Sequence, residues 1–297
     1  MRQCWFLRED GPNVMVLLGP HGDLIQMLPA WQEIYHLTGR KPIVLVSQQY
    51  APTLEGVSYV EALPFNGHWA RDVPKARAYA ESRWGRCTVL AWWNDIAQVP
   101  IEFRGSLALN CRGRECNINT FKWPSYGHSM WERAGFPYEH DMLTLPLVFD
   151  RRDQKREAQL IDRFKAFSKP LLLYNFTAKS SPFGHVPELW PILQLFRRDF
   201  TLLDLGAIRC HRIYDLLGLY DVAAGLLTCD TATLHLAPAS TVPYIAFTQN
   251  GWCGSVPKGN CVLNIRYSDT IRRLPEVRSV LENWRCEFTP KEPAGEI

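Results

Sequence analysis

Asp23 is a carboxylate at a position where it could carry out chemistry. It follows an apolar run over 14–18 and the turn Gly19-Pro-His-Gly22. The two glycines let the backbone turn tightly and leave room for a ligand, and a carboxylate there could take a proton from a hydroxyl group. The local sequence alone favours a structural role over a catalytic one, because Asp23 with Gln26 three residues later matches a capping box at a helix start. The residues leave both interpretations open, and G-x-x-G lacks the third glycine of a dinucleotide fingerprint.

A second polar turn, Asp230-Thr231-Ala232-Thr233, separates an expected buried strand over 223–229 from a helix expected to begin near Leu234. Backbone N–H groups and hydroxyls meet at such a helix start, which makes it a ready phosphate site. Asp230 would repel a phosphate that it faced, so we expect it to cap the turn. An ordinary capped helix is the alternative interpretation. His235, on the apolar side of that helix, is expected to be a core residue rather than a catalyst.

A third polar segment follows the expected strand over 170–176 and supplies a cation and hydroxyls from Thr177, Lys179, Ser180 and Ser181. A lone surface lysine is usually only solvated. Lys179 is nevertheless a candidate binding residue, because its loop is expected at the same sheet edge as Asp230. Both loops would there face one cleft between two domains.

The elements that must position these residues follow an α/β pattern. Short runs rich in Val, Ile and Leu alternate with amphipathic segments, as in parallel strands connected by helices. Strands are expected over 14–19, 42–47, 88–93 and 106–110, and then over 170–176, 200–206, 223–229, 242–248 and 260–265. The segment 24–37 is expected to be a helix. The sequence therefore predicts two Rossmann-like domains, 1–149 and 150–297, with the boundary in the Pro-containing piece 145–160.

Composition excludes several classes of protein. The chain has 297 residues, 46% of them hydrophobic, and a net charge of +3 that does not by itself imply nucleic-acid binding. No apolar run approaches the roughly 20 residues that cross a bilayer. Charged residues precede any long apolar segment, so no signal peptide is expected and the predicted location is cytoplasmic. The 9 cysteines suggest reduced thiols, and the spacing of Cys111 and Cys116 matches no common zinc site.

Two parts of the chain resemble the bacterial lipopolysaccharide heptosyltransferase family, which uses ADP-heptose. GDLIQMLPAWQEI (22–34) followed by IVLVSQQYAPTLEGVSYVEALPF (43–65) is similar to the amino-terminal part of that family. The segment 202–252 resembles its carboxyl-terminal part, including the Asp-Ser/Thr-Gly-x-x-His-x-Ala turn that binds the donor diphosphate. The resemblance implies a GT-B fold with two Rossmann-like domains facing a central cleft. Between about 65 and 141 nothing resembles the family.

The resemblance also implies a function, a nucleotide-sugar-dependent glycosyltransferase that is inverting and needs neither a metal nor a separate cofactor. The first domain would bind the acceptor and the second the nucleotide-sugar, and Asp23 would be the general base. Donor contacts are expected from Thr177, Lys179, Ser180, Asp230, Thr231, Ala232, Thr233 and His235. Acceptor contacts are expected from His21, Gly22, Trp123, Tyr126 and His128. The implied acceptor is a surface glycan or a similar molecule.

Two residues depart from the family pattern. Ala232 stands where the family usually has glycine, which matters if that residue has positive φ, and Pro238 should kink or shorten the helix. These departures leave open a binding protein that kept the fold and lost the chemistry. The aromatic stretch between Trp69 and Trp131, with the arginines near Cys111, leaves open an acceptor base in modified DNA. A sugar-nucleotide epimerase is a further alternative, because it would use the same two-domain architecture without an acceptor.

Overall fold

The structure is a computed structural model, and it describes residues 11–69, 71–90, 130, 145–164, 169–179, 181–249 and 257–288. The strand expected over 106–110 and the residues Cys111, Cys116, Trp123, Tyr126, His128 and Ser180 lie outside these ranges. The contacts divide the chain into two compact units. Unit 1 comprises Met1–Asp153, His211–Tyr214 and Gly251–Val256, and unit 2 comprises Gln154–Cys210, Asp215–Asn250 and Pro257–Ile297.

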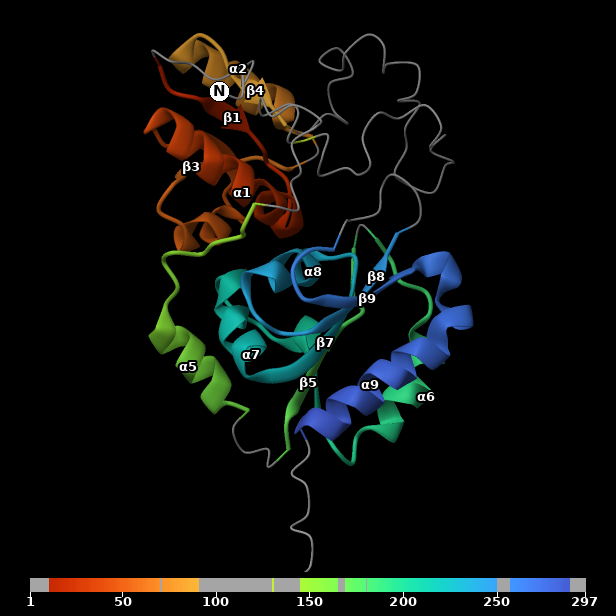
Figure 1. Ribbon diagram of the computed structural model, residues 1–297. Coiled ribbons are helices and arrows are strands. Elements are labelled where there is room, and N and C mark those ends of the chain that lie inside the picture. Colours follow the sequence, from red (N-terminus) through yellow and green to blue (C-terminus); the bar gives the residue numbers. More distant parts are fainter. Residues whose placement is uncertain are drawn as a thin grey trace, which may run out of the picture. The chain divides into compact units, whose positions relative to one another are not determined.

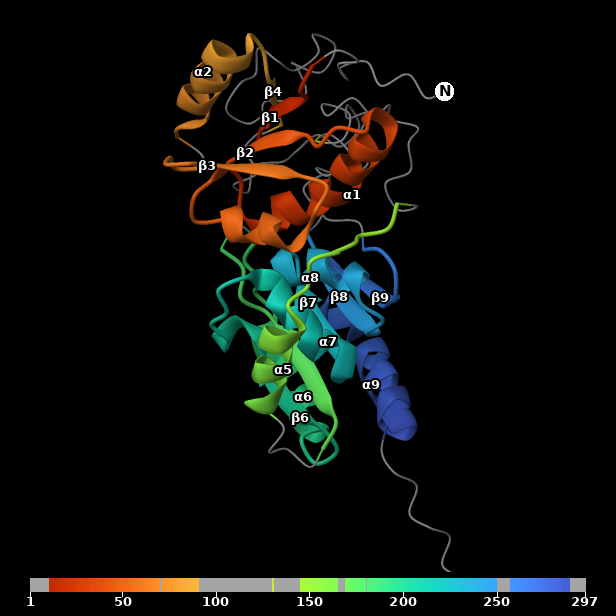
Figure 2. The same ribbon diagram turned by 90° about the vertical axis from the view of Figure 1, so that its left-hand side faces the viewer.

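Unit 1 contains a parallel sheet in the order β3-β2-β1-β4 (Figure 1, Figure 2). Its strands are β1 (Val14–Val16), β2 (Ile43–Ser47), β3 (Glu61–Phe65) and β4 (Thr88–Val89). Strands β1 and β2 confirm the strands expected over 14–19 and 42–47. Strand β4 confirms the start of the strand expected over 88–93, of which residues 91–93 lie outside the described ranges, and β3 was not predicted. β3 contains Pro64, which cannot donate to a sheet ladder, and among the described strands β3 lies at the sheet edge, where proline is tolerated.

The helices of unit 1 are α1 (His21–Thr38) and α2 (Val73–Trp84). The apolar face of α1 is buried, and the Trp31 Nε1–H donates to the Met15 sulfur at 3.3 Å. The capping-box interpretation of Asp23 is wrong, because α1 begins earlier than the pattern indicates. Pro20, with φ −68°, is the N-cap residue, and Asp23 lies within the first turn. An acidic residue in that turn is favoured by the positive end of the helix.

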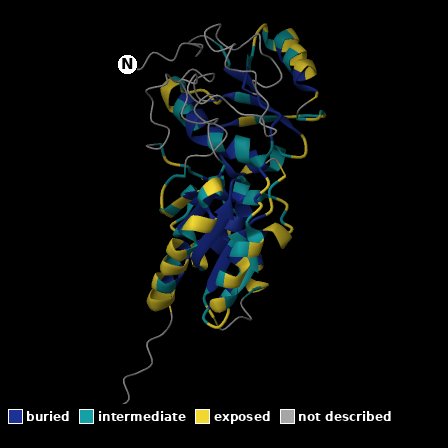
Figure 3. Cartoon of the chain, turned by 90° about the vertical axis from the view of Figure 1, so that its right-hand side faces the viewer, coloured by how far each residue is buried: buried dark blue, intermediate teal, exposed yellow. Residues whose placement is uncertain are grey.

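Unit 2 contains a second parallel sheet in the order β6-β5-β7-β8-β9. Its strands are β5 (Leu171–Asn175), β6 (Thr201–Asp204), β7 (Ala223–Cys229), β8 (Tyr244–Thr248) and β9 (Cys261–Arg266). All of the strands expected in this half are confirmed, and no end is shifted by more than two residues. The middle strands are buried (Figure 3), which explains their continuous apolar sequences.

Helices cover both faces of this sheet. They are α5 (Gln154–Asp162), α6 (Val186–Leu195), α7 (Leu217–Val222), α8 (Ala232–Leu236) and α9 (Leu274–Phe288). Helices α6 and α9 share one core with the sheet, whereas α5 and α7 pack together on its other side (Figure 1). Among the described residues, no helix combines the length and the apolar character needed to cross a bilayer.

Candidate functional site

The strand order of unit 2 identifies a site between β5 and β7. The chain proceeds from β5 to β6 on one side and returns to place β7 on the other. In open parallel sheets, ligands bind outside the carboxyl ends of the strands at such a switch point. The two loops that start there are the segment after Asn175 and the turn Asp230–Thr233.

Buried hydrogen bonds join the start of one loop to the turn. The Asn175 Nδ2–H donates to Thr233 Oγ1 at 3.2 Å, and its Oδ1 accepts from the Thr177 N–H at 2.9 Å. The Thr228 hydroxyl donates to the Cys229 carbonyl, so the Thr233 hydroxyl is the donor in their 2.7 Å contact. The Thr233 hydroxyl is thus used inside unit 2, as both donor and acceptor.

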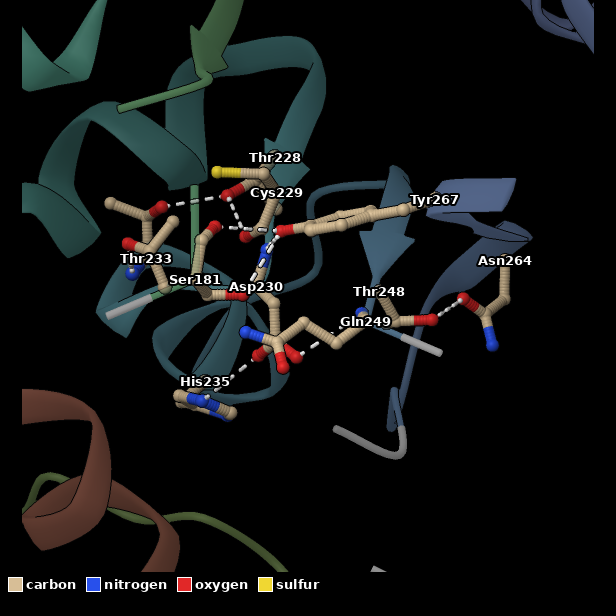
Figure 4. A network of polar contacts seen from close by, with 11 residues as sticks. Ser181, Thr228, Cys229, Asp230, Thr233, His235, Thr248, Gln249, Asn264 and Tyr267 are labelled. Atoms are coloured by element: carbon tan, nitrogen blue, oxygen red, sulfur yellow. Dashed lines mark hydrogen bonds and ion pairs between the residues drawn. The ribbon is translucent and has the colours of Figure 1, made fainter. Parts of the chain in front are cut away.

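A second set of contacts joins the end of the same loop to the turn (Figure 4). The Tyr267 hydroxyl lies 3.1 Å from the Asp230 nitrogen and 3.1 Å from the Ser181 carbonyl oxygen. Tyr267 comes from the turn that follows β9. The loop that carries Thr177 and Lys179 is therefore attached to the same turn at both of its ends.

Asp230 is buried, with 8% of the residue exposed. It accepts from the Gln249 N–H at 3.4 Å and lies 3.7 Å from His235 Nε2 (Figure 4). The N-cap residue of α8 is Thr231, whose hydroxyl accepts from the Thr233 N–H, so the cap expected of Asp230 comes from its neighbour. Burial lowers the pKa of His235 more than the nearby Asp230 raises it, and the imidazole is neutral at pH 7.

Several polar groups of these loops remain open to a ligand. The N–H groups of Thr231 and Ala232 make no hydrogen bond within the described ranges. Thr177 and Lys179 are exposed, and Lys179 forms no ion pair with the described part of the chain. Two adjacent amides, a hydroxyl and an ammonium group form a set of donors suited to phosphate oxygens.

Of the two residues that depart from the family pattern, Ala232 is accommodated without strain and Pro238 shortens its helix. Ala232 is the first residue of α8, and no described residue other than glycine has positive φ. Alanine therefore fits that position without backbone strain. Pro238 does shorten the helix, as expected, because α8 ends at Leu236 and a 3-10 turn over Ala237–Ala239 follows.

In unit 1, Asp23 lies after β1, which is flanked by β2 and β4 at the switch point of that sheet. A Cβ on Gly19 would come within 2.5 Å of Asp23 Oδ2, so the carboxylate lies against the Gly19 backbone. Burial, and secondarily the charge of Asp23, raises the pKa of Tyr50. Asp23, His21 and Gly22 are all partly exposed.

His21, two residues before Asp23, contacts Thr53 and Tyr50. Its Nδ1 lies 2.6 Å from Thr53 Oγ1, and its ring meets Tyr50 edge-on at 4.9 Å. Burial lowers the pKa of His21, which favours the neutral imidazole.

The structure thus places the predicted residues in two groups, His21, Gly22 and Asp23 in unit 1, and Thr177, Lys179, Asp230, Thr231, Ala232, Thr233 and His235 in unit 2. The sequence analysis missed Asn175 and Tyr267. Asn175 had a usable signal, since a polar residue at the end of a buried strand needs a hydrogen-bond partner. Tyr267 had none, because its partners are 37 and 86 residues away.

Comparisons with known proteins establish the fold. No protein-family profile and no curated protein matches the chain significantly. Among solved structures, Escherichia coli ADP-heptose lps heptosyltransferase II is similar, with a TM-score of 0.58 and 15% identity over 93% of this chain and 99% of that one. A glycosyl transferase family 9 protein from Veillonella parvula has a TM-score of 0.57 and 12% identity, over 95% of this chain and 99% of that one. The E. coli heptosyltransferase WaaC with ADP has a TM-score of 0.54 and 12% identity, over 94% of this chain and 100% of that one. The chain therefore has the GT-B fold of these proteins, with two Rossmann-like domains, as the sequence predicts.

Proposed function

We propose that this protein is a glycosyltransferase that moves a sugar from a nucleotide-sugar donor to an acceptor hydroxyl. One observation carries the proposal: Thr177, Lys179 and the two open amides of Thr231 and Ala232 lie on loops held together at the switch point of unit 2. This set of donors suits a diphosphate. Structures of the same fold have been solved with ADP and with ADP-2-deoxy-2-fluoro heptose, which supports a nucleotide-sugar as the ligand.

The chemistry follows from the charges that each unit supplies. In unit 1, Asp23 accepts the proton of the acceptor hydroxyl as that oxygen attacks the anomeric carbon. In unit 2, Lys179 and the amides of Thr231 and Ala232 stabilise the negative charge that develops on the departing nucleoside diphosphate. Direct attack by the acceptor inverts the configuration at the sugar carbon. The proposed reaction requires no metal, because fixed amides and an ammonium group meet the developing charge, and the proposed acceptor is a glycan.

The donor is identified first, by thermal stabilisation with a panel of nucleotide-sugars and nucleoside diphosphates. A ligand at 100 times its Kd adds about 2.7 kcal/mol of stability. We expect the protein to be stabilised by the nucleotide-sugar and by the nucleoside diphosphate of one and the same nucleoside. Failure of every member of the panel to stabilise the protein would overturn the proposal. Stabilisation without transfer to any acceptor would identify a binding protein, and turnover of the donor without an acceptor would identify an epimerase.

The role of Asp23 is then tested with Asp23→Asn, which keeps the shape of the side chain and removes its basicity. We expect the rate of transfer to fall roughly 10²–10⁴-fold, the usual contribution of a general base. The affinity for the nucleoside diphosphate should stay unchanged, because those contacts belong to unit 2. Glu33→Gln, on the same helix, is the matched control and should keep the parent rate. A transfer rate for Asp23→Asn within about twofold of the parent would remove the base assignment.

A further inference from the structure

The Tyr267 hydroxyl joins two loops from other parts of unit 2. It lies between Ser181, at the end of the loop after β5, and Asp230, at the start of the turn after β7 (Figure 4). Tyr267 itself follows β9. Three separate segments of unit 2 therefore meet at one oxygen atom.

The hydrogen bonds of this oxygen can be assigned by counting protons. A phenol has one hydrogen to donate and two lone pairs to accept with. The Tyr267 hydroxyl donates to the Ser181 carbonyl at 3.1 Å and accepts from the Asp230 N–H at 3.1 Å. In its 3.2 Å contact with Ser181 Oγ, the serine must then be the donor. These three contacts use the one hydrogen and both lone pairs of the hydroxyl within unit 2.

The ring of Tyr267 is held by aromatic packing. Its centroid lies 5.0 Å from that of Phe183, and the Phe183 ring lies 5.0 Å from that of Phe247 on β8. These contacts fix the direction in which the hydroxyl points. The ring would stay in place if the hydroxyl were removed, because the packing does not depend on the oxygen.

The loop between Asn175 and Ser181 has one anchor at each end. Asn175 attaches its start to Thr233, and Tyr267 attaches its end to the Asp230 amide. Lys179 lies between these anchors, and its side chain is exposed. Because Tyr267 also occupies the Asp230 amide, the N–H groups of this turn left for a ligand are those of Thr231 and Ala232.

We propose that Tyr267 is a positioning residue of the donor site, which holds the Lys179 loop against the Thr231–Ala232 amides and so sets the affinity for the diphosphate group. The inference rests on the proposed function for the identity of the ligand. Tyr267 acts through the loops it joins, so its loss should weaken the binding of phosphate groups more than it slows the chemical step. Ordering the loop in the free protein reduces the entropy lost on binding.

Tyr267→Phe tests this role, since it keeps the ring and removes all three hydrogen bonds. The probes are the nucleoside diphosphate that stabilises the parent and the corresponding nucleoside without phosphate. We expect the Kd of the diphosphate to rise by about tenfold, which is the effect of losing about one buried hydrogen bond. The Kd of the nucleoside should change by less than about twofold, and KM for the donor should rise more than kcat falls.

Tyr174→Phe is the matched control, because the Tyr174 hydroxyl makes no hydrogen bond in the described part of unit 2. It should leave both affinities at the parent values. Ser181→Ala removes one bond of the same oxygen, and its effect on diphosphate affinity should be less than additive with that of Tyr267→Phe.

Hydrogen exchange separates the failure of this inference from the failure of the proposed function. Tyr267→Phe should speed exchange of the amides of Asp230, Lys179 and Ser181, whether or not a nucleotide is present. Unchanged exchange and unchanged diphosphate affinity, in a protein whose parent binds the nucleotide, would overturn the positioning role alone. A parent that binds no nucleotide would overturn the proposed function and the donor-site role together.

Discussion

Gly19 is required by the side chain of Asp23 rather than by its own backbone angle. No positive φ is found at Gly19, but a Cβ there would come within 2.5 Å of the Asp23 carboxylate. The sequence analysis attributed this glycine to a tight turn. In the structure, the glycine is needed because the Asp23 carboxylate lies close to its backbone. A larger residue at position 19 would therefore displace the Asp23 side chain.

His235 illustrates how burial can outweigh a neighbouring charge. Its side chain is 10% exposed, and Asp230 lies 3.7 Å away. Loss of hydration lowers the pKa of His235, the carboxylate raises it, and Lys258 lowers it further, with burial the largest effect. The histidine is therefore a neutral partner of Asp230.

The buried neutral His235 predicts a loss of stability in mild acid. Below about pH 6.5 the unfolded chain binds a proton at this residue that the folded chain does not bind. The free energy of unfolding should therefore fall as the pH drops from 7 to 5, by at most about 1.4 kcal/mol per pH unit for one proton. His235→Asn should reduce this slope, as measured by urea unfolding at each pH. The control is His36→Asn, at an exposed position on α1. Equal slopes in the parent and His235→Asn would contradict the prediction.

At the scale of elements, the strands of unit 2 could be predicted because each is a short apolar run buried in a parallel sheet. Strand β3 could not, since Pro64 argues against a strand unless its position at an edge is known. The start of α1 was misplaced because Pro20 begins the helix without a capping side chain.

The candidate site was only partly predictable for a related reason. Asp23, Lys179 and Thr231 lie in the segments that follow β1, β5 and β7, and a local pattern of apolar runs and polar residues indicates where those segments begin. Asn175 and Tyr267 act through partners that are distant in sequence, at 58 residues for Asn175 and 37 for Tyr267. Their role is set by tertiary packing, which a local pattern does not record.

The packing of β7 against α9 gives a prediction at the same scale. Gly225 lies directly against the indole ring of Trp284, and an added Cβ would overlap that ring. Gly225→Ala should lower the free energy of unfolding by about 1–3 kcal/mol, the usual cost of overpacking. Gly184→Ala is the control, because, apart from its chain neighbours, no described residue has a heavy atom within 4 Å of the added Cβ. Chemical denaturation measures both, and equal stabilities would contradict the described packing.

At the scale of the whole molecule, membership of a unit does not follow the order of the chain. His211–Tyr214 comes after β6 of unit 2 in sequence, yet it packs within unit 1. The Tyr214 ring stacks on Phe149 at 5.3 Å, and both rings lie against Gly56. Arg212 lies over Tyr214 and donates to Asp153 at 2.9 Å.

Arg212 should therefore stabilise unit 1 although it comes from the second half of the chain. Arg212→Ala removes a charged hydrogen bond and a cation–π contact, so we expect the free energy of unfolding to fall by about 1–2 kcal/mol. Arg209→Ala is the control, since Arg209 is exposed and forms no ion pair in the described part of the chain. Thermal unfolding of both variants checks the expectation. An Arg212→Ala protein that unfolds at the same temperature as the parent would contradict it.

The packing of Tyr214 on Phe149 also constrains the order of events during synthesis. Domains usually fold as they leave the ribosome, the amino-terminal one first. Here β1 to β4 emerge early, but the surface formed by Gly56 and Phe149 stays open until Tyr214 has been translated, after β5 and β6. The first unit to begin folding therefore cannot finish until much of the second has been made. A nascent chain stopped before Tyr214 would expose that apolar surface.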